Sequence, residues 1–185
     1  WKHPTALVRA QAASALGQLG ASAAHAVPAL ALATADPDAE VRKASARAIG
    51  LTRRGAPEAG QALREALGDP DAEVRAAAAA ALRELGQLSE ADCLELLRDG
   101  TDAVQMEALE ALADLPTLGE ELLLEACGCL RGDHNVEVKV RAAAVLGDAE
   151  VQSVAVLDSL LEAARTAEAA VRAECLRSLA SLDGF

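Results

Sequence analysis

The sequence predicts an all-α protein, a right-handed α-solenoid (superhelix) of about five and a half stacked two-helix repeats. The first observation is a heptapeptide, Asp-Pro-Asp-Ala-Glu-Val-Arg, that occurs at residues 36–42 and again at residues 69–75. The second is that the valine of this motif recurs at positions 8, 41, 74, 104, 138 and 171, in steps of 33, 33, 30, 34 and 33. Such a period is typical of stacked helical repeats, in which a single helix pair cannot bury its apolar faces alone.

Residues 36–50 illustrate how the second helix of a repeat is predicted. Asp36 can cap a helix with its carboxylate, and Pro37 suits the first helical position because its missing N–H would be unpaired there. Three, four, seven and eight positions after Val41, small and apolar residues share one helical face: Ala44, Ser45, Ala48 and Ile49. Gly50 follows, where either close packing or a helix exit would favour glycine. The first helices of the repeats are expected at about residues 24–35, 57–68, 89–98, 118–131 and 150–165.

The period organises residues 1–185 as one solenoid with a partial first repeat. The repeats are expected at about residues 1–20, 21–53, 54–86, 87–116, 117–149 and 150–185. The first of them lacks its first helix, and neither end shows the polar outer face that normally caps a stack of repeats. We therefore expect the sequence to be part of a longer chain or of a larger assembly.

The repeated unit resembles a known family. Its motif Asp-Pro-Asp-Ala-Glu-Val-Arg-x-Ala-x-Ala-x-Ala-Leu/Ile-Gly, preceded by Ala26-Val27-Pro28-Ala29-Leu30, is similar to the HEAT repeat, in the short form found in phycobilin lyase subunits. The resemblance covers essentially the whole chain, and it is highly specific for the fold but only weakly specific for the function.

The resemblance also implies a structural ladder. In HEAT repeats of this form, the Asp of the turn and the Arg after the valine form hydrogen bonds that run from repeat to repeat. The intact pairs expected here are Asp36/Arg42 and Asp69/Arg75. The ladder weakens elsewhere, in the pairs His3/Arg9, Asp99/Gln105, Asp133/Lys139 and Thr166/Arg172. We interpret these residues as structural and not as a binding patch.

The charge distribution favours a protein partner over nucleic acid. Of the formal net charge of −12, residues 1–86 contribute ten Lys/Arg and nine Asp/Glu, and residues 87–185 contribute seven Lys/Arg and twenty Asp/Glu. An acidic half repels phosphate backbones, so we expect no nucleic acid and a basic or helical protein segment as partner. The alternative is an acidic exterior that only aids solubility. No apolar run reaches the about 18 residues of a membrane span, so no membrane insertion is expected.

The residue types that usually carry catalysis or bind metals form no functional pattern. None of His3, His25 and His134 is followed by Glu, so the His-Glu pairs that hold the di-iron centre of HEAT-like deoxyhypusine hydroxylase are missing. The spacing of the cysteines fits no zinc site; they are Cys93, Cys127, Cys129 and Cys175. We expect no enzyme activity, no cofactor and no metal. Free thiols suit a reducing, intracellular compartment, so the cytoplasm is the expected location.

The exposed positions of the second helices form the expected binding surface. By analogy with HEAT solenoids, the second helix of each pair lines the concave side, where the small residues of this chain would give a smooth groove. The expected partner-binding residues are Lys43, Arg47, Met106, Glu107, Glu110, Val140 and Arg177. The hypothesis is a non-enzymatic interaction scaffold or adaptor that binds a partner's helix or extended segment along this face. The alternative, also implied by the resemblance, is an accessory subunit of an enzyme complex, such as a chromophore-handling bilin lyase.

Overall fold

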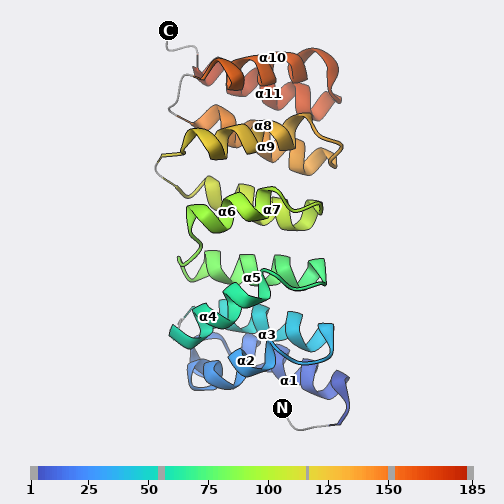
Figure 1. Cartoon of the computed structure of the whole chain (residues 1–185), viewed down its shortest axis with the longest axis vertical. Coiled ribbons are helices and arrows are strands. Elements are labelled where there is room, and N and C mark those ends of the chain that lie inside the picture. The colour runs from blue at the N-terminus through green and yellow to red at the C-terminus, as the bar shows by residue number, and fades with distance from the viewer. Residues whose placement is uncertain (1–3, 54–56, 116, 150–152, 183–185) are drawn as a thin grey trace. The chain divides into compact units, whose positions relative to one another are not determined.

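The computed structural model describes residues 4–53, 57–115, 117–149 and 153–182, which form helices joined by short turns (Figure 1). These residues contain no strand, and their 3₁₀ helix is η1 (Gly20–Ala26). The α-helices are α1 (Ala6–Gln18), α2 (Val27–Ala33), α3 (Ala39–Thr52), α4 (Pro57–Ala66), α5 (Ala72–Glu84), α6 (Glu90–Leu97), α7 (Asp102–Leu112), α8 (Glu120–Arg131), α9 (Val136–Asp148), α10 (Val154–Thr166) and α11 (Ala169–Leu182). The predicted all-α class is confirmed.

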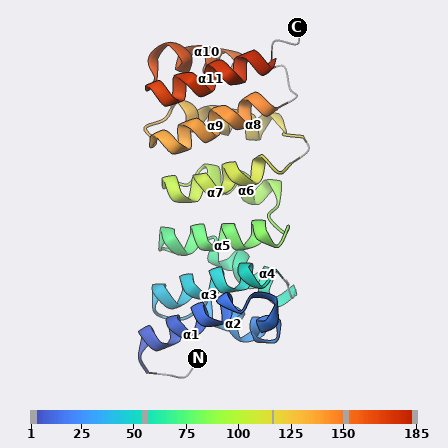
Figure 2. The same ribbon diagram turned by 180° about the vertical axis from the view of Figure 1, so that it is seen from behind.

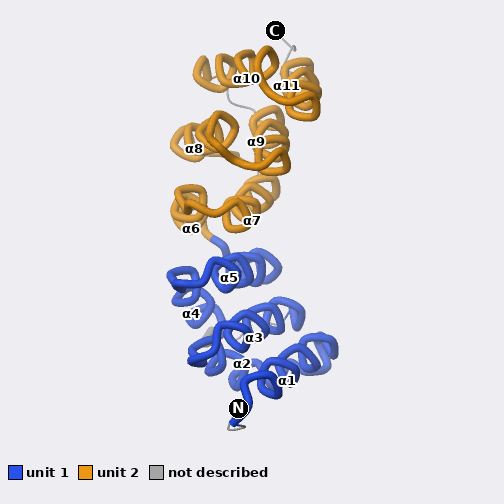
Figure 3. The backbone as a smooth tube through the Cα atoms, turned by 90° about the vertical axis from the view of Figure 1, so that its right-hand side faces the viewer, with its two compact units in different colours: residues 1–88 blue, residues 89–185 orange. Residues whose placement is uncertain are grey.

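The helices form two compact units, residues 1–88 (unit 1) and residues 89–185 (unit 2), which Figure 3 colours separately. In unit 1, α2 packs on α3 and α4 packs on α5, so each first helix (A helix) pairs with the second helix (B helix) that follows it. The B helices α1, α3 and α5 also stack in order, as Figure 2 shows from their side. In unit 2 the pairs are α6 with α7, α8 with α9 and α10 with α11, and the B helices α7, α9 and α11 stack in turn. The two-helix repeat is therefore the building block of both units.

The turn that precedes α3 differs from the prediction. Asp38, not Asp36, caps the helix, because its Oδ1 atom accepts hydrogen bonds from two backbone N–H groups of the first turn at 3.0 and 3.3 Å. Pro37 lies before this cap and outside the helix. The Oδ1 atom of Asp36 instead accepts the N–H of Asp38 at 3.0 Å, which closes a turn that leads into the helix. Asp69 and Asp71 repeat the arrangement before α5.

Gly50 lies inside a helix and not at a helix exit. α3 continues to Thr52, and Arg53 directly after it takes the left-handed conformation with φ 48°. A Cβ atom at Gly50 would lie 2.9 Å from the Cα of Ala81, so α3 and α5 could not keep their separation with a larger residue there. Gly17 plays the same part between α1 and α3, where a Cβ atom would lie 3.0 Å from the Cα of Ala48. Close packing is therefore the reason for these glycines.

The A helices agree with the prediction except at their ends. The helix predicted over residues 24–35 is divided into η1 and α2, with Pro28 in the first turn of α2, where a missing N–H breaks no helical bond. The helices predicted near residues 57, 89 and 118 correspond to α4, α6 and α8. The last predicted A helix corresponds to α10, and its expected start at residue 150 lies outside the described residues.

The repeated valine marks the core of each helix pair. The valines at positions 41, 74, 104, 138 and 171 have no exposed surface, whereas Val8 is 42% exposed. The difference arises because no A helix precedes α1 in the part of the chain that the structure describes. α1 therefore packs mainly on α3 and η1, and one side of it remains open.

The close approach of the B helices leads to a test with two glycines. We expect Gly50→Ala to lower the free energy of unfolding by about 1–3 kcal/mol, because the added methyl group overlaps the backbone of Ala81. Gly128, in α8, is exposed and has open space around it, so Gly128→Ala should raise the free energy of unfolding by up to about 1 kcal/mol through helix propensity. Urea unfolding of both variants is the measurement, and a stabilising effect of Gly50→Ala would contradict the packing argument.

Candidate functional site

Arginine side chains join successive turns in unit 1. Arg9 donates from Nε and Nη2 to the carboxylate of Asp36 at 2.8 and 2.7 Å, and Arg42 donates in the same way to Asp69 at 2.7 and 2.8 Å. The Nη1 atom of Arg42 also donates to the backbone carbonyl of Asp36 at 3.0 Å, as that of Arg75 does to Asp69 at 2.8 Å. The expected pairs Asp36/Arg42 and Asp69/Arg75 thus meet through the backbone, and the carboxylate contacts link one turn to the next. Arg9, assigned to a weakened pair with His3 (which lies outside the described residues), instead binds Asp36.

These contacts favour the ionised carboxylates. The hydrogen bonds from Arg9 and from the Asp38 N–H hold the pKa of Asp36 below its ordinary value, although burial opposes them. Burial acts most strongly on Asp69, but the hydrogen bond from Arg42 and the charges nearby outweigh it, so the pKa of Asp69 is also lowered. Both carboxylates are therefore charged at neutral pH and held in place by bidentate contacts.

Unit 2 replaces the arginines by other contacts. Gln105, which stands at the arginine position of α7, donates from Nε2 to the carbonyls of Leu97 and Asp99 at 3.0 and 2.7 Å. The carboxylate of Asp99 accepts the N–H of Thr101 at 3.0 Å. Between α7 and α9, the link is made by Asp102, which contacts the Nδ1 atom of His134 at 3.0 Å and accepts the N–H of Asn135 at 3.1 Å. The sequence analysis did not predict this link, because Asp102, His134 and Asn135 do not match the residues of the repeated motif at their positions.

The remaining expected ladder residues lie at the surface. Asp133 is exposed and Lys139 is half-buried, and neither forms a hydrogen bond or an ion pair with another described residue. Arg172 donates from Nη1 to the carbonyl of Ala167 at 2.9 Å, which is a contact within its own turn. The turn-to-turn carboxylate contacts that the structure shows for arginine thus belong to unit 1.

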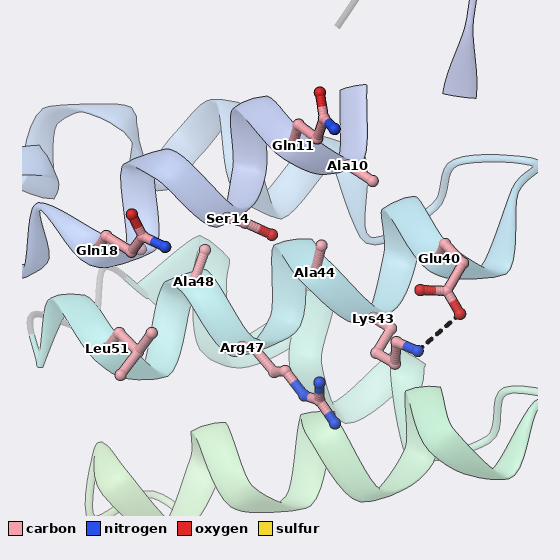
Figure 4. A pocket seen from close by; sticks show the side chains of 11 residues that line it. Ala10, Gln11, Ser14, Gln18, Glu40, Lys43, Ala44, Arg47, Ala48 and Leu51 are labelled. Carbon is pink, nitrogen blue, oxygen red and sulfur yellow. Dashed lines mark hydrogen bonds and ion pairs between the residues drawn. The ribbon is translucent and has the colours of Figure 1, made fainter. Parts of the chain in front are cut away.

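A groove of about 360 Å³ runs between α1 and α3 on the exposed side of the B helices, the B-helix face (Figure 4). Small residues leave this space open: Ala10, Ser14, Gly17, Ala44 and Ala48. Larger side chains border it, and these are Gln11, Gln18, Glu40, Lys43, Arg47 and Leu51. The groove brings together two of the expected partner-binding residues, Lys43 and Arg47. Sequence reasoning missed Gln11 and Gln18, although their spacing of seven residues places both along one side of α1.

The two cations of the groove differ in their surroundings. The Nζ atom of Lys43 lies 2.7 Å from carboxylate oxygens of both Glu40 and Glu73, and only 14% of its side chain is exposed. The hydrogen bond to Glu40, followed by that to Glu73, raises the pKa of Lys43. Arg47 is exposed, and it forms no hydrogen bond or ion pair with the residues that the structure describes. Arg47 is therefore the cation of this groove that is available to a partner.

The expected partner-binding residues of unit 2 are less open. Met106, Glu107 and Glu110 of α7 are half-buried, and so is Val140 of α9. Arg177 of α11 has a 72% exposed side chain, but it forms an ion pair with Glu174 of the same helix. The apolar side chains of Met106 and Val140, which we expected at the surface, are thus partly covered.

The cysteines and the acidic residues do not form a reactive or metal-binding centre in the described ranges. All four cysteines are free and buried, and burial followed by nearby carboxylates raises the pKa of Cys93 and of Cys129 to about 11. Among the described residues, no group of three or more His, Cys, Asp or Glu is placed to hold a metal ion. In the same part of the chain, every helix is too short or too polar to span a bilayer.

Two family descriptions match the sequence. Residues 26–113 match HEAT repeats, and residues 8–36 match the PBS lyase HEAT-like repeat, so that the two matches together span residues 8–113. The chain belongs to the HEAT repeat family. No curated protein matches this HEAT-repeat chain.

Solved structures of engineered repeat proteins share the fold of this HEAT-repeat protein. One engineered protein has a TM-score of 0.68 and 22% identity, with 100% of this chain and 96% of that chain covered. A designed armadillo repeat protein has a TM-score of 0.60 and 19% identity, covering 98% and 96%. A second designed armadillo repeat protein, in complex with the peptide (KR)4, has a TM-score of 0.60 and 18% identity, covering 94% and 91%. At such identities the likeness concerns the fold alone.

The arginine contacts lead to a stability test. We expect Arg42→Ala or Asp69→Ala to lower the free energy of unfolding by about 1–3 kcal/mol, because each leaves a partly buried polar partner without its hydrogen bonds. Arg47→Ala, in the same helix as Arg42, should change it by less than about 0.5 kcal/mol, because Arg47 is exposed. Equal shifts of the melting temperature in the three variants would contradict this assignment.

The same contacts predict a pH dependence. Because the pKa values of Asp36 and Asp69 are lowered in the folded state, their contribution to stability is present above the unfolded value of about 3.9 and is lost as the pH falls through the folded value. The stability difference between the wild type and Arg42→Gln should therefore be constant near neutral pH and shrink below about pH 4. The difference for Arg47→Gln should show no such decrease, and urea titrations at several pH values provide the measurement.

Proposed function

We propose that this HEAT-repeat protein is a non-enzymatic scaffold that binds segments of other proteins along the B-helix face. The observation that carries the proposal is the groove between α1 and α3, which is lined by small residues and bordered by Gln11, Gln18 and Arg47, and these three have no hydrogen-bond partner among the described residues. Main-chain segments and side chains of a partner can approach closely where the protein's own side chains are short. The designed armadillo repeat protein solved with (KR)4 supports the idea that a stack of helical repeats can hold a peptide.

The charge of the chain supports a basic partner for unit 2. Residues 87–185 carry twenty Asp/Glu against seven Lys/Arg. Such a surface attracts cationic segments and accelerates their association at low ionic strength. It also disfavours nucleic acid, because phosphates would meet like charge. We propose a reducing compartment, the cytoplasm, as the location, since the four free buried thiols fit that environment.

A second candidate is an accessory subunit of a bilin lyase, and it is favoured by the match of residues 8–36 to the PBS lyase HEAT-like repeat. This alternative predicts a stoichiometric open-chain tetrapyrrole on the protein after purification from its native source. A scaffold predicts none. Absorption spectroscopy of the purified protein separates the two.

The scaffold itself is tested by affinity capture from the native source, followed by mass spectrometry and reconstitution of the complex from purified components. We expect a protein that binds directly and in a defined ratio. Failure of every captured protein to bind after purification would overturn the scaffold.

The charge of unit 2 leads to a kinetic prediction with (KR)4 as the probe. We expect its association rate constant to fall about tenfold or more between low and high salt, because screening weakens the attraction. Glu107→Lys with Glu110→Lys on α7 should lower the association rate more than it changes the dissociation rate. The control is Glu95→Lys with Glu162→Lys, which makes the same change in net charge on the A helices α6 and α10. Equal decreases of the association rate in the two double variants would show that only the net charge matters and that the peptide has no preferred face.

A further inference from the structure

We propose that an extended acidic segment of a partner binds in the groove between α1 and α3 and that Arg47, which extends from α3 on the side away from α1, holds one carboxylate side chain that reaches across α3. The inference rests on the proposed scaffold function and names the chemistry that unit 1 recognises. It differs from the partner proposed for unit 2, which is basic.

The size of the groove favours an extended segment over a helix. Its volume of about 360 Å³ is at the lower end of the range for small-ligand sites. An α-helix with its side chains is about 10–12 Å wide, which is too wide for a space of this volume. Ser14 of α1 faces Ala44 and Ala48 of α3, as Figure 4 shows, and the two helices come closest where Gly17 lies against Ala48. A few residues of extended chain fit this shape.

The electrostatics of the groove favour a carboxylate. α1 carries no acidic residue, and its one charged side chain, Arg9, already binds Asp36. In Figure 4 Arg47 extends from α3 away from α1 and toward α5, whose half-buried residues include Ala76, Ala80 and Arg83 and whose Glu73 carboxylate binds Lys43. Among the described residues, no carboxylate forms an ion pair with the Arg47 guanidinium, whose planar donors match the two oxygens of a carboxylate.

The two acidic residues nearest the groove are paired with Lys43. Glu40 and Glu73 both bind Lys43, one helical turn before Arg47, and this arrangement covers the lysine. The two cations are therefore not equivalent: the lysine is used within the protein, and the guanidinium is left for a ligand. A basic segment such as (KR)4 would meet Arg47 with like charge and is excluded from this groove.

Two amides supply contacts for the main chain of the segment. Gln11 and Gln18 line the groove from α1, and neither side chain forms a hydrogen bond with the residues that the structure describes. Seven helical residues span about 10.5 Å, which is close to the length of three residues of extended chain. Each amide offers a donor and an acceptor, so the pair can bind the N–H and C=O groups of a segment at two points.

The test uses the full chain and capped, fluorescently labelled peptides of extended conformation, (Glu-Pro)4 and its neutral counterpart (Gln-Pro)4. We expect wild-type protein to bind (Glu-Pro)4 at least about tenfold more tightly than (Gln-Pro)4, as measured by fluorescence anisotropy in about 0.1 M salt. Arg47→Gln should abolish this preference. Absence of binding to (Glu-Pro)4, or equal binding of both peptides, would overturn the proposal.

Three further variants test whether binding of (Glu-Pro)4 depends on the groove and on Arg47 in particular. Arg177→Gln removes an exposed arginine at the corresponding position of α11, where Glu174 already pairs with it, so binding should change by less than about twofold. Ser14→Phe fills the groove without altering any charge and should weaken (Glu-Pro)4 binding about as much as Arg47→Gln. Glu40→Gln should tighten binding a few-fold, because it removes a negative charge from the rim. An equal loss in Arg177→Gln and Arg47→Gln would overturn the proposal.

The outcomes also separate this inference from the scaffold function. A captured partner whose binding is insensitive to Arg47→Gln and Ser14→Phe would overturn the acidic-segment site and leave the scaffold intact. Preference for (Glu-Pro)4 without any directly binding partner from the native source would support the groove and overturn the scaffold. Tighter binding of single-stranded DNA than of (Glu-Pro)4, lost in Arg47→Gln, would assign the groove to phosphate and overturn the carboxylate site.

Discussion

The close contact between glycine and alanine on neighbouring B helices is the constraint on which unit 1 depends. A Cβ atom would lie 3.0 Å from the Cα of Ala48 at Gly17 and 2.9 Å from the Cα of Ala81 at Gly50, so α3 lies close to both α1 and α5 at these points. Because the helices lie so close, an arginine of one repeat can reach the turn of the next repeat. Arg9 thus binds Asp36, and Arg42 binds Asp69. Short side chains on the B-helix face, such as those of Ser14, Ala44 and Ala48, leave space between α1 and α3, and this space is the groove.

Unit 2 meets the same constraint with different residues. At the crossing of α9 and α11, Gly147 lies against Ser178, and the hydroxyl group of Ser178 donates to the carbonyl of Ala143 at 2.9 Å. Ser178 therefore adds a hydrogen bond between the two helices, whereas unit 1 has only the contact with alanine at this position. Between α7 and α9, Asp102 is bound by His134 and Asn135 of the following turn, whereas the turn aspartates of unit 1 are bound by an arginine of the preceding repeat. The repeat geometry tolerates these exchanges because each contact involves only adjacent repeats.

The 33-residue period and the helical spacing of small residues were sufficient to predict the class of fold and the helix pairs. They could not distinguish Asp36 from Asp38 as the cap, since both are good capping residues and the choice depends on Arg9, 27 residues away. They also grouped Lys43 with Arg47, because the sequence does not show that Glu73 of the next repeat covers the lysine. A groove is harder still to predict, because it arises where side chains are short. Gln11 and Gln18 can be recognised as residues that line a groove only once the space beside them is known.

An alanine-rich face also limits how such a protein can bind. Burial contributes about 25 cal/mol for each Å² of apolar surface, and Ala76, Ala80 and their neighbours offer little surface each. Shape and apolar area alone would therefore let a partner slide along the face without a preferred position. A lone guanidinium changes this, because its favourable geometry is satisfied at one place only. In unit 1 the register of a bound segment would thus be set by Arg47, while the small residues around it determine how closely the backbone of the segment can approach.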